Sequence, residues 1–193
     1  MKRNISIMIG LLFILGSLMN VQAAELKKGD KMELIKFDKG EMFGSGEANI
    51  SLTKEKAEKG KMYSCKVSFK KGDKLGFLGI TGDSGLLKGK RGNWEGYDSL
   101  NIKYISTASK PIRYEMLIGD QQALDKWRYG NYCSRSVTIQ PGENVLSIDI
   151  TGIVCDQGRQ MDLTNMRNFL FYNTGQADED FAIYFLSVWV EKE

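Results

Sequence analysis

The 193-residue sequence contains no histidine, and this absence excludes several kinds of site. A catalytic triad that uses histidine, a histidine general base and a histidine-ligated metal all need an imidazole ring. The three cysteines contain no C-x-x-C pair, the spacing that is typical of structural zinc sites. We therefore expect no catalytic residues of these kinds and no zinc site.

Only one long apolar run is present, at residues 5–19. Lys2 and Arg3 precede this run, and Val21-Gln22-Ala23 follows it with small residues at the positions that a signal peptidase reads. The run is shorter than the ~20 residues that a membrane-spanning helix needs. We therefore predict a signal peptide over residues 1–23, with Ala24 as the second choice for the cleavage site. The rest, residues 24–193, is expected to form a single exported domain, periplasmic or secreted, with no membrane span.

Neither sign of charge dominates the expected mature chain. Removing Lys2 and Arg3 from the 27 basic residues leaves 25, against 24 acidic residues. A protein that binds nucleic acid or a membrane surface through charge has a marked basic excess. We therefore expect neither kind of partner, and we interpret the interspersed charges as a solvated surface.

An odd number of cysteines leaves at least one thiol without a partner in the same chain. Cys65 shares the apolar parity of its segment, so we expect a buried thiol there. Cys133 and Cys155 lie in less regular and more polar segments. A disulfide between them is compatible with an oxidising compartment, but the sequence does not show how far apart they lie.

Alternating apolar and polar residues recur along the chain, which is typical of antiparallel strands with one buried face. The apolar positions of five such runs are Tyr63, Cys65, Val67 and Phe69; Leu100, Ile102 and Tyr104; Ile112, Tyr114, Met116 and Ile118; Val137 and Ile139; and Leu146, Ile148 and Ile150. No segment has a sustained helical period. Many short strands predict an all-β fold, a two-sheet antiparallel β-sandwich of the jelly-roll type.

Two later runs, residues 168–172 and 181–190, are apolar on both parities. Such strands lie in the centre of a sheet or are covered on both faces. Pro141-Gly142 favours a tight reversal, so we also predict a hairpin that joins the strands around Val137 and Ile148.

Several motifs occur in an order that resembles the galactose-binding-like β-sandwich superfamily. Trp94-Glu95-Gly96-Tyr97-Asp98 leads into a strand, Pro141-Gly142-Glu143-Asn144 forms a turn, and Asp162-Leu163-Thr164-Asn165-Met166-Arg167 precedes a further strand. The chain looks most like carbohydrate-binding modules of bacterial glycoside hydrolases and like domains of complex I intermediate-associated proteins. The resemblance covers nearly all of residues 24–193 and implies a β-sandwich that binds carbohydrate.

Relatives in this superfamily often end in a strand whose aspartate helps to hold a structural calcium ion. The matching segment here, Tyr184-Phe185-Leu186-Ser187-Val188, has no acidic residue. Asp38 and Glu41 offer oxygen ligands, but calcium needs six to eight that converge. We therefore expect no cofactor, and a calcium ion at Asp38 and Glu41 is not favoured.

One segment combines aromatic and hydrogen-bonding residues, as sugar recognition requires. Its candidate ligand-binding residues are Trp127, Arg128, Tyr129, Asn131, Tyr132 and Arg135. The three aromatic rings would stack on a sugar ring, while the polar side chains would bind its hydroxyl groups. The alternative is that Trp127 and Tyr129 cover the edge of the core. We interpret Trp94, Tyr97 and Trp189 as core residues.

Three hypotheses follow for function. The first is a secreted, non-catalytic module that binds carbohydrate or a similar polar ligand. The second is an envelope or surface domain that binds another protein and has no sugar site. The third, a small hydrolase, would need a carboxylate pair such as Asp120 and Asp125, and two loop aspartates are far more often ordinary surface acids. We therefore predict that the protein is not an enzyme.

Overall fold

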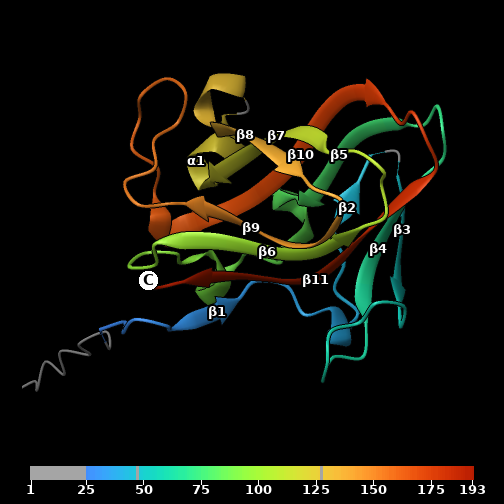
Figure 1. Cartoon of the computed structure of the whole chain (residues 1–193). Helices are drawn as coiled ribbons and strands as arrows, with labels where there is room; N and C mark the ends of the chain where they lie inside the picture. Colours follow the sequence, from blue (N-terminus) through green and yellow to red (C-terminus); the bar gives the residue numbers. More distant parts are fainter. Residues whose placement is uncertain (1–24, 47, 127) are drawn as a thin grey trace, which may run out of the picture.

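A computed structural model describes residues 25–46, 48–126 and 128–193 of the chain. Its strands form two antiparallel sheets, which confirms the predicted β-sandwich (Figure 1). The six-stranded sheet has the order β3 (Asn49–Thr53), β4 (Ser64–Phe69), β11 (Phe181–Glu191), β6 (Ser99–Ser106) and β9 (Gly142–Asp149), and β1 (Lys31–Glu33) also pairs with β11. The five-stranded sheet has the order β2 (Gly44–Ser45), β5 (Lys74–Ile80), β10 (Met166–Gln176), β7 (Ile112–Asp120) and β8 (Cys133–Ile139).

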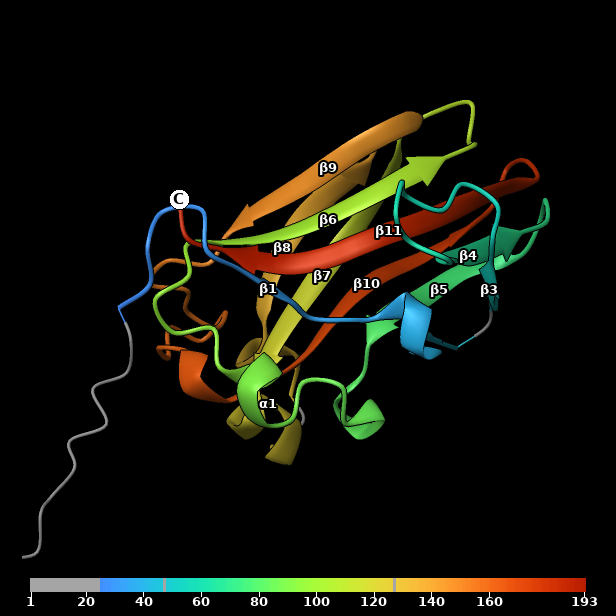
Figure 2. The same ribbon diagram turned by 90° about the horizontal axis from the view of Figure 1, so that it is seen from below.

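Figure 2 shows the sheets as two layers, with β9, β6 and β11 in one and β8, β7 and β10 in the other. Short helices lie in the connections: α1 (Gln121–Asp125) and the 3-10 turns η1 (Phe37–Lys39), η2 (Gly82–Ser84), η3 (Gly89–Gly92), η4 (Tyr129–Asn131) and η5 (Leu163–Asn165). One cluster of buried side chains from both sheets fills the space between the layers. The alternation of each strand explains this packing, because one parity faces the partner sheet.

The two runs that are apolar on both parities have the central positions that were predicted. β10 lies between β5 and β7, and β11 lies between β4 and β6. On the core side, Phe171 packs against Tyr114 and Phe185, with ring centroids 5.8 and 6.0 Å apart. On the opposite side, Tyr184 and Leu186 of β11 form a small buried cluster with Ala182. The second apolar parity of β10 faces the outside of the five-stranded sheet.

The predicted hairpin around Pro141 is wrong, although both of its strands exist. β8 pairs with β7 in the five-stranded sheet, whereas β9 pairs with β6 in the six-stranded sheet. The turn therefore crosses from one layer to the other. Gly142 has a φ of 82°, which only glycine adopts without strain. A turn signal marks a reversal of the chain, but it does not determine which strands pair afterwards.

Trp94 is fully buried and Tyr97 packs against the core from a half-buried position, as predicted. The prediction for Trp189 is wrong. Trp189 is half-buried on the outer face of the six-stranded sheet, with the Lys31 ammonium group 5.1 Å from its ring centroid. Its neighbours Val188 and Val190 have the parity that enters the core.

Cys65 is buried, as predicted, and so are Cys133 and Cys155; all three are free thiols in this structure. The predicted signal peptide lies outside the described residues. Within the described ranges, no helix is long and apolar enough to cross a membrane.

Candidate functional site

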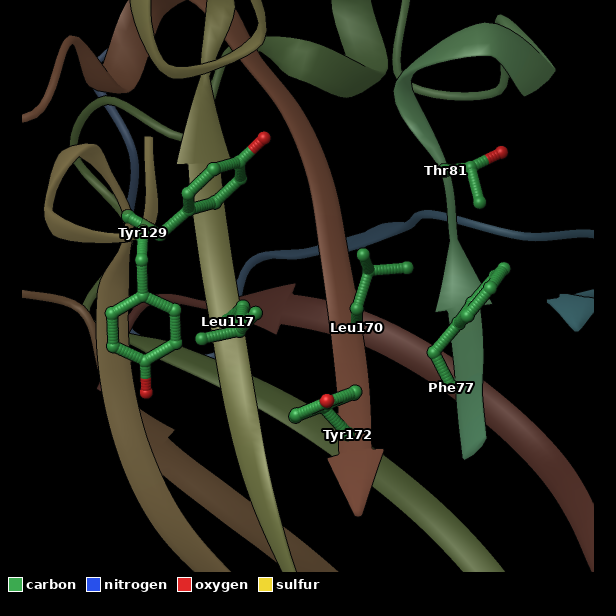
Figure 3. A pocket seen from close by; sticks show the side chains of 7 residues that line it. Phe77, Thr81, Leu117, Tyr129, Leu170 and Tyr172 are labelled. Carbon is green, nitrogen blue, oxygen red and sulfur yellow. The ribbon is translucent and has the colours of Figure 1, made fainter. Parts of the chain in front are cut away.

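The outer face of the five-stranded sheet carries a groove of about 380 Å³, and we call it the aromatic groove. It is lined by Phe77, Thr81, Leu117, Tyr129, Tyr132, Leu170 and Tyr172. Figure 3 shows Leu117 and Leu170 on neighbouring strands, with Tyr129 on one side of them and Phe77 on the other. The groove therefore runs across the strands rather than along one of them.

Strand register brings these residues together. In one row across the sheet, Leu170 of β10 pairs with Leu117 of β7 and with Gly79 of β5. In the next row, Tyr172 of β10 pairs with Glu115 of β7 and with Phe77 of β5. Residues directly opposite in an antiparallel pair point to the same face. The leucines and the glycine of the first row form the floor, and Tyr172 and Phe77 of the second row form a wall.

Three aromatic side chains around this floor remain accessible. Tyr129 is 51% exposed, Tyr172 39% and Phe77 37%. Aromatic rings are usually buried in a folded domain, so three exposed rings on one face indicate a surface that binds a ligand or a partner. The surface that they line is mostly apolar, with hydroxyl groups at Thr81 and at the tyrosines. This arrangement fits the flat apolar face of a ring-shaped ligand.

Tyr132 also lines the groove, and a glycine makes room for its ring. Its ring lies directly over Gly119 of β7, where an added Cβ atom would come within 2.7 Å of the ring. The Asn168 side-chain oxygen would lie 2.3 Å from the same Cβ atom. Because Gly119 has no side chain, the ring of Tyr132 can pack directly on the strand. Tyr132 is therefore buried, with 3% of it exposed.

Tyr129 is held in place over the sheet by its hydroxyl group. This group donates a hydrogen bond to the carboxylate of Glu115, which projects from the same face of β7. The bond to Glu115 raises the pKa of Tyr129. Because the ring is fixed at both ends, by η4 and by Glu115, it forms a pre-arranged wall rather than a free side chain.

The segment predicted from the sequence is only partly at this groove. Tyr129 and Tyr132 line it. Asn131 instead donates from its side-chain amide to the carbonyl of Lys126, 2.6 Å away, and so closes its own turn. Arg128 is exposed and lies outside the lining of the groove. Trp127 lies outside the described residues.

Arg135 has the wrong parity to reach the groove. It is paired with Met116, whose side chain is in the core, so its own side chain leaves from the inner face at the edge strand β8. At the end of β9, hydrogen bonds from Thr151 are the main cause of the lowered pKa of Asp149, and the positive charge of Arg135 makes a smaller contribution in the same direction. Arg135 therefore lies between the edges of the two sheets.

Sequence reasoning missed five of the groove residues: Phe77, Thr81, Leu117, Leu170 and Tyr172. A signal for three of them was present. Leu117 interrupts the polar parity of its run, and Leu170 and Tyr172 supply the second apolar parity of β10. Phe77, Leu117, Leu170 and Tyr172 come from three strands, β5, β7 and β10, and only the strand order makes them neighbours.

The two aspartates considered for hydrolysis do not form a catalytic pair. Asp120 is fully buried, and its carboxylate binds both terminal nitrogens of Arg159, at 2.6 and 3.0 Å. Burial raises the pKa of Asp120. The hydrogen bonds from Arg159 and from the backbone N–H groups of Asp162 and Ala123 together lower this pKa by more than burial raises it, so the net shift is downward. Asp125 is exposed and accepts a hydrogen bond from Gln121. One buried, ionised carboxylate and one surface carboxylate do not meet the requirement for two acids that face a substrate.

The carboxylates considered for calcium are already bound to protein groups. Asp38 accepts the backbone N–H groups of Met62 and Tyr63, at 2.8 and 3.0 Å. Glu41 binds the guanidinium group of Arg91, at 2.8 and 2.9 Å, and the backbone N–H of Lys36. These residues do not fit a calcium site. Among the described residues, no three acidic or cysteine side chains converge as a metal site.

Comparison with known proteins identifies the fold. No protein-family model and no curated protein matches the sequence. A solved structure of the module CtCBM11 has a TM-score of 0.60 at 14% identity, with 85% of this chain and 95% of the module covered. A family 11 carbohydrate-binding module from Clostridium thermocellum, in complex with a β-1,3-1,4-mixed-linked tetrasaccharide, has a TM-score of 0.53 at 14% identity, covering 86% of this chain and 97% of that one.

The agarase AgWH50C has a TM-score of 0.56 at 13% identity, and the match covers 86% of this chain but only 25% of the agarase. The matched region therefore makes up nearly all of the solved module chains but only a quarter of the agarase chain. At these identities the similarity establishes fold alone. The predicted resemblance is confirmed at that level: the chain has the β-sandwich fold of carbohydrate-binding modules.

Proposed function

We propose that this protein is a non-catalytic carbohydrate-binding domain and that the aromatic groove is its binding site. The observation that carries the proposal is the set of three exposed rings, Phe77, Tyr129 and Tyr172, around a floor formed by Leu117 and Leu170. A sugar ring has one flat face of C–H groups, which stacks on aromatic side chains, and hydroxyl groups around its edge. The fold similarity to carbohydrate-binding modules supports the same function.

The positions and hydrogen bonds of the carboxylates near the groove support binding without catalysis. Among the residues that the structure describes, no acidic side chain lines the groove, and Glu115 at its border is bound to Tyr129. The N-terminal sequence supports export, and we propose that the domain acts in the periplasm or outside the cell. Both are places where a polysaccharide is accessible to a protein.

Native gel electrophoresis in gels that contain a soluble polysaccharide tests the proposal. Mixed-linked β-1,3-1,4-glucan is a suitable first ligand, because a module with the same fold was solved with a tetrasaccharide of this type. Agarose is a second, because the fold also matches a quarter of an agarase. Binding should retard the wild-type protein. Phe77→Ala and Tyr172→Ala should each weaken the affinity roughly tenfold or more, since loss of an aromatic anchor costs about 2 kcal/mol.

Trp189→Ala provides the matched control, because Trp189 is a half-buried aromatic residue on the outer face of the other sheet. This variant should bind as the wild type does. Equal loss of affinity in Trp189→Ala and Phe77→Ala would place the site elsewhere.

A protein partner is the second candidate function, and the apolar lining of the groove favours it. A leucine floor with aromatic walls also accepts apolar side chains of a peptide. Failure of a folded domain to bind any of a broad panel of polysaccharides would favour this alternative over the sugar site.

A further inference from the structure

A second hollow adjoins the aromatic groove, and Tyr172 forms part of both. This polar hollow has a volume of about 470 Å³ and is lined by Arg113, Tyr114, Glu115, Ser136, Tyr172, Asn173 and Thr174. We propose that it is a second sugar subsite, so that the ligand is a neutral oligosaccharide that spans Tyr172 rather than a single sugar. This inference rests on the proposed function of the aromatic groove.

The two hollows follow one another along the same face of the sheet. On β7, Leu117 belongs to the groove, and Glu115 and Arg113 follow at the next two positions of the same parity. At about 3.3 Å per residue, Leu117 and Arg113 lie about 13 Å apart along the strand. This distance exceeds the width of one sugar ring, so a ligand that contacts both must contain more than one ring.

Arg113 lines the hollow, and a hydrogen bond to the neighbouring strand restrains its guanidinium group. Its Nε atom donates to the hydroxyl oxygen of Ser136 on β8, at 2.7 Å. Its carbonyl accepts a bond from the side-chain amide of Asn173 on β10, at 2.6 Å. Within the described ranges, its terminal nitrogens have no hydrogen-bond or ion-pair partner. The bond from Nε to Ser136 therefore restrains the guanidinium group, and its terminal N–H donors are available to a ligand.

Glu115 supplies the complementary acceptor. One of its carboxylate oxygens accepts the hydroxyl proton of Tyr129, and the other accepts no hydrogen bond from the described part of the chain. A sugar hydroxyl group both donates and accepts, so a guanidinium group beside a carboxylate fits neighbouring hydroxyls of a sugar. Because the two charges compensate each other, the hollow favours a neutral sugar over one that carries carboxylates or sulfates.

The two hollows differ in the groups that they offer, so we assign stacking to the aromatic groove and hydrogen bonding to the polar hollow. The groove offers stacking surface and few hydrogen-bonding groups, whereas the polar hollow offers directed donors and acceptors with Tyr172 as its aromatic side. A ligand gains from both only when it crosses Tyr172. Affinity should therefore depend on the length of the ligand.

Isothermal titration calorimetry of the folded domain with gluco-oligosaccharides of the mixed-linked type, from the disaccharide to the hexasaccharide, tests the inference. A parallel series is measured with agarose oligosaccharides. For the wild type, affinity should rise about tenfold between the short and the long members, as expected for added hydrogen bonds to charged groups. Arg113→Ala should remove this rise and leave the affinity for the short members unchanged. Ser136→Ala, which releases Nε of Arg113, should have a smaller effect in the same direction.

Arg135→Ala is the matched control, because Arg135 is an exposed arginine on the neighbouring strand with its side chain on the other face. It should follow the wild type at every length. An affinity that does not change with length, or an Arg113→Ala effect that is equal for short and long ligands, would overturn the second subsite but keep the groove. Tighter binding of oligogalacturonate than of neutral chains would overturn the neutral assignment. If no oligosaccharide of either series binds, both the proposed function and this inference fail.

Discussion

Tyr129 shows how a single exposed residue can be prepared for binding. A free tyrosine on a surface loses side-chain freedom when a ligand stacks on it, and that loss weakens binding. Here the hydrogen bond to Glu115 has already restricted the ring in the unbound protein. The ring and its hydroxyl group therefore contribute to binding in different ways, and two variants separate them.

We predict that Tyr129→Ala weakens sugar binding about tenfold or more, because it removes the stacking surface. Tyr129→Phe keeps the ring but loses the bond to Glu115, and should weaken binding only a few-fold. Titration calorimetry checks both values. Equal affinities for the two variants would show that the hydroxyl group alone matters, and would contradict a stacking role.

Asp120 and Arg159 form a buried ion pair whose role is stability. Asp120 also accepts the N–H groups of Ala123 and Asp162, and so it joins the start of α1 to the loop before η5. Because these partners lower the pKa of Asp120 in the folded state, its stabilising contribution is present above its pKa in the unfolded chain. This contribution begins to be lost when the pH falls below the pKa of an aspartate in the unfolded chain, about 4. It is lost completely once the pH is also below the lower pKa of Asp120 in the folded state.

We predict that Asp120→Asn lowers the free energy of unfolding at neutral pH by about 3 kcal/mol, as breaking a buried pair does. It should also reduce the fall in stability between neutral and acid pH. Urea unfolding at several pH values measures both effects.

Asp178→Asn is the control. Within the described ranges, Asp178 makes only an exposed ion pair with Lys110, at 3.8 Å, so this variant should leave stability unchanged. A wild-type stability that rises on acidification would contradict the assignment.

At the scale of elements, the loop over residues 153–162 supports η4, the turn that carries Tyr129. The backbone N–H of Gln157 donates to the carbonyl of Gly130 at 3.0 Å, and that of Asp156 donates to the carbonyl of Tyr132 at 2.9 Å. The Asp156 carboxylate also accepts the N–H and the hydroxyl group of Ser134. None of the loop residues lines the groove, so they would act on binding only by positioning the turn.

We predict that Asp156→Asn weakens sugar binding several-fold, because the turn with Tyr129 loses part of its support. Glu179→Gln is a matched control: the Glu179 carboxylate likewise accepts the N–H and the hydroxyl group of one serine, Ser109. Glu179 lies in the connection between β10 and β11 and should not affect binding. Affinity and melting temperature are measured for both. Equal losses of affinity, or a loss only in Glu179→Gln, would contradict the positioning role.

The strands could largely be predicted from the sequence, because alternation is a local signal. The central positions of β10 and β11 were also predictable from their two apolar parities. The pairing partners of β8 and β9 could not be predicted, because a turn that crosses between two sheets contains the same residue types as the turn of a hairpin. Trp189 illustrates a second limit: in a strand with both parities apolar, sequence does not tell which parity faces the core. The groove combines β5, β7 and β10, so it depends on strand order, which a local pattern does not contain.

At the scale of the whole molecule, the sandwich buries all three thiols, and burial raises the pKa of Cys65 to about 11. Burial also raises the pKa of Cys133. We predict that the native protein reacts slowly with a thiol reagent at mildly alkaline pH, and that unfolding without reductant exposes three reactive thiols. A count of one thiol in the purified protein would show instead that two of the three cysteines are joined, with Cys133 and Cys155 as the expected pair.

We propose above that a carbohydrate ligand binds the outer face of the five-stranded sheet. Amide chemical-shift mapping by NMR during titration with a mixed-linked gluco-oligosaccharide tests it most directly. The largest shifts should occur at Phe77, Leu117, Leu170 and Tyr172, with little change at Lys103 and Ser147 on the other sheet. Shifts concentrated on the six-stranded sheet, or no shifts with any oligosaccharide, would contradict it.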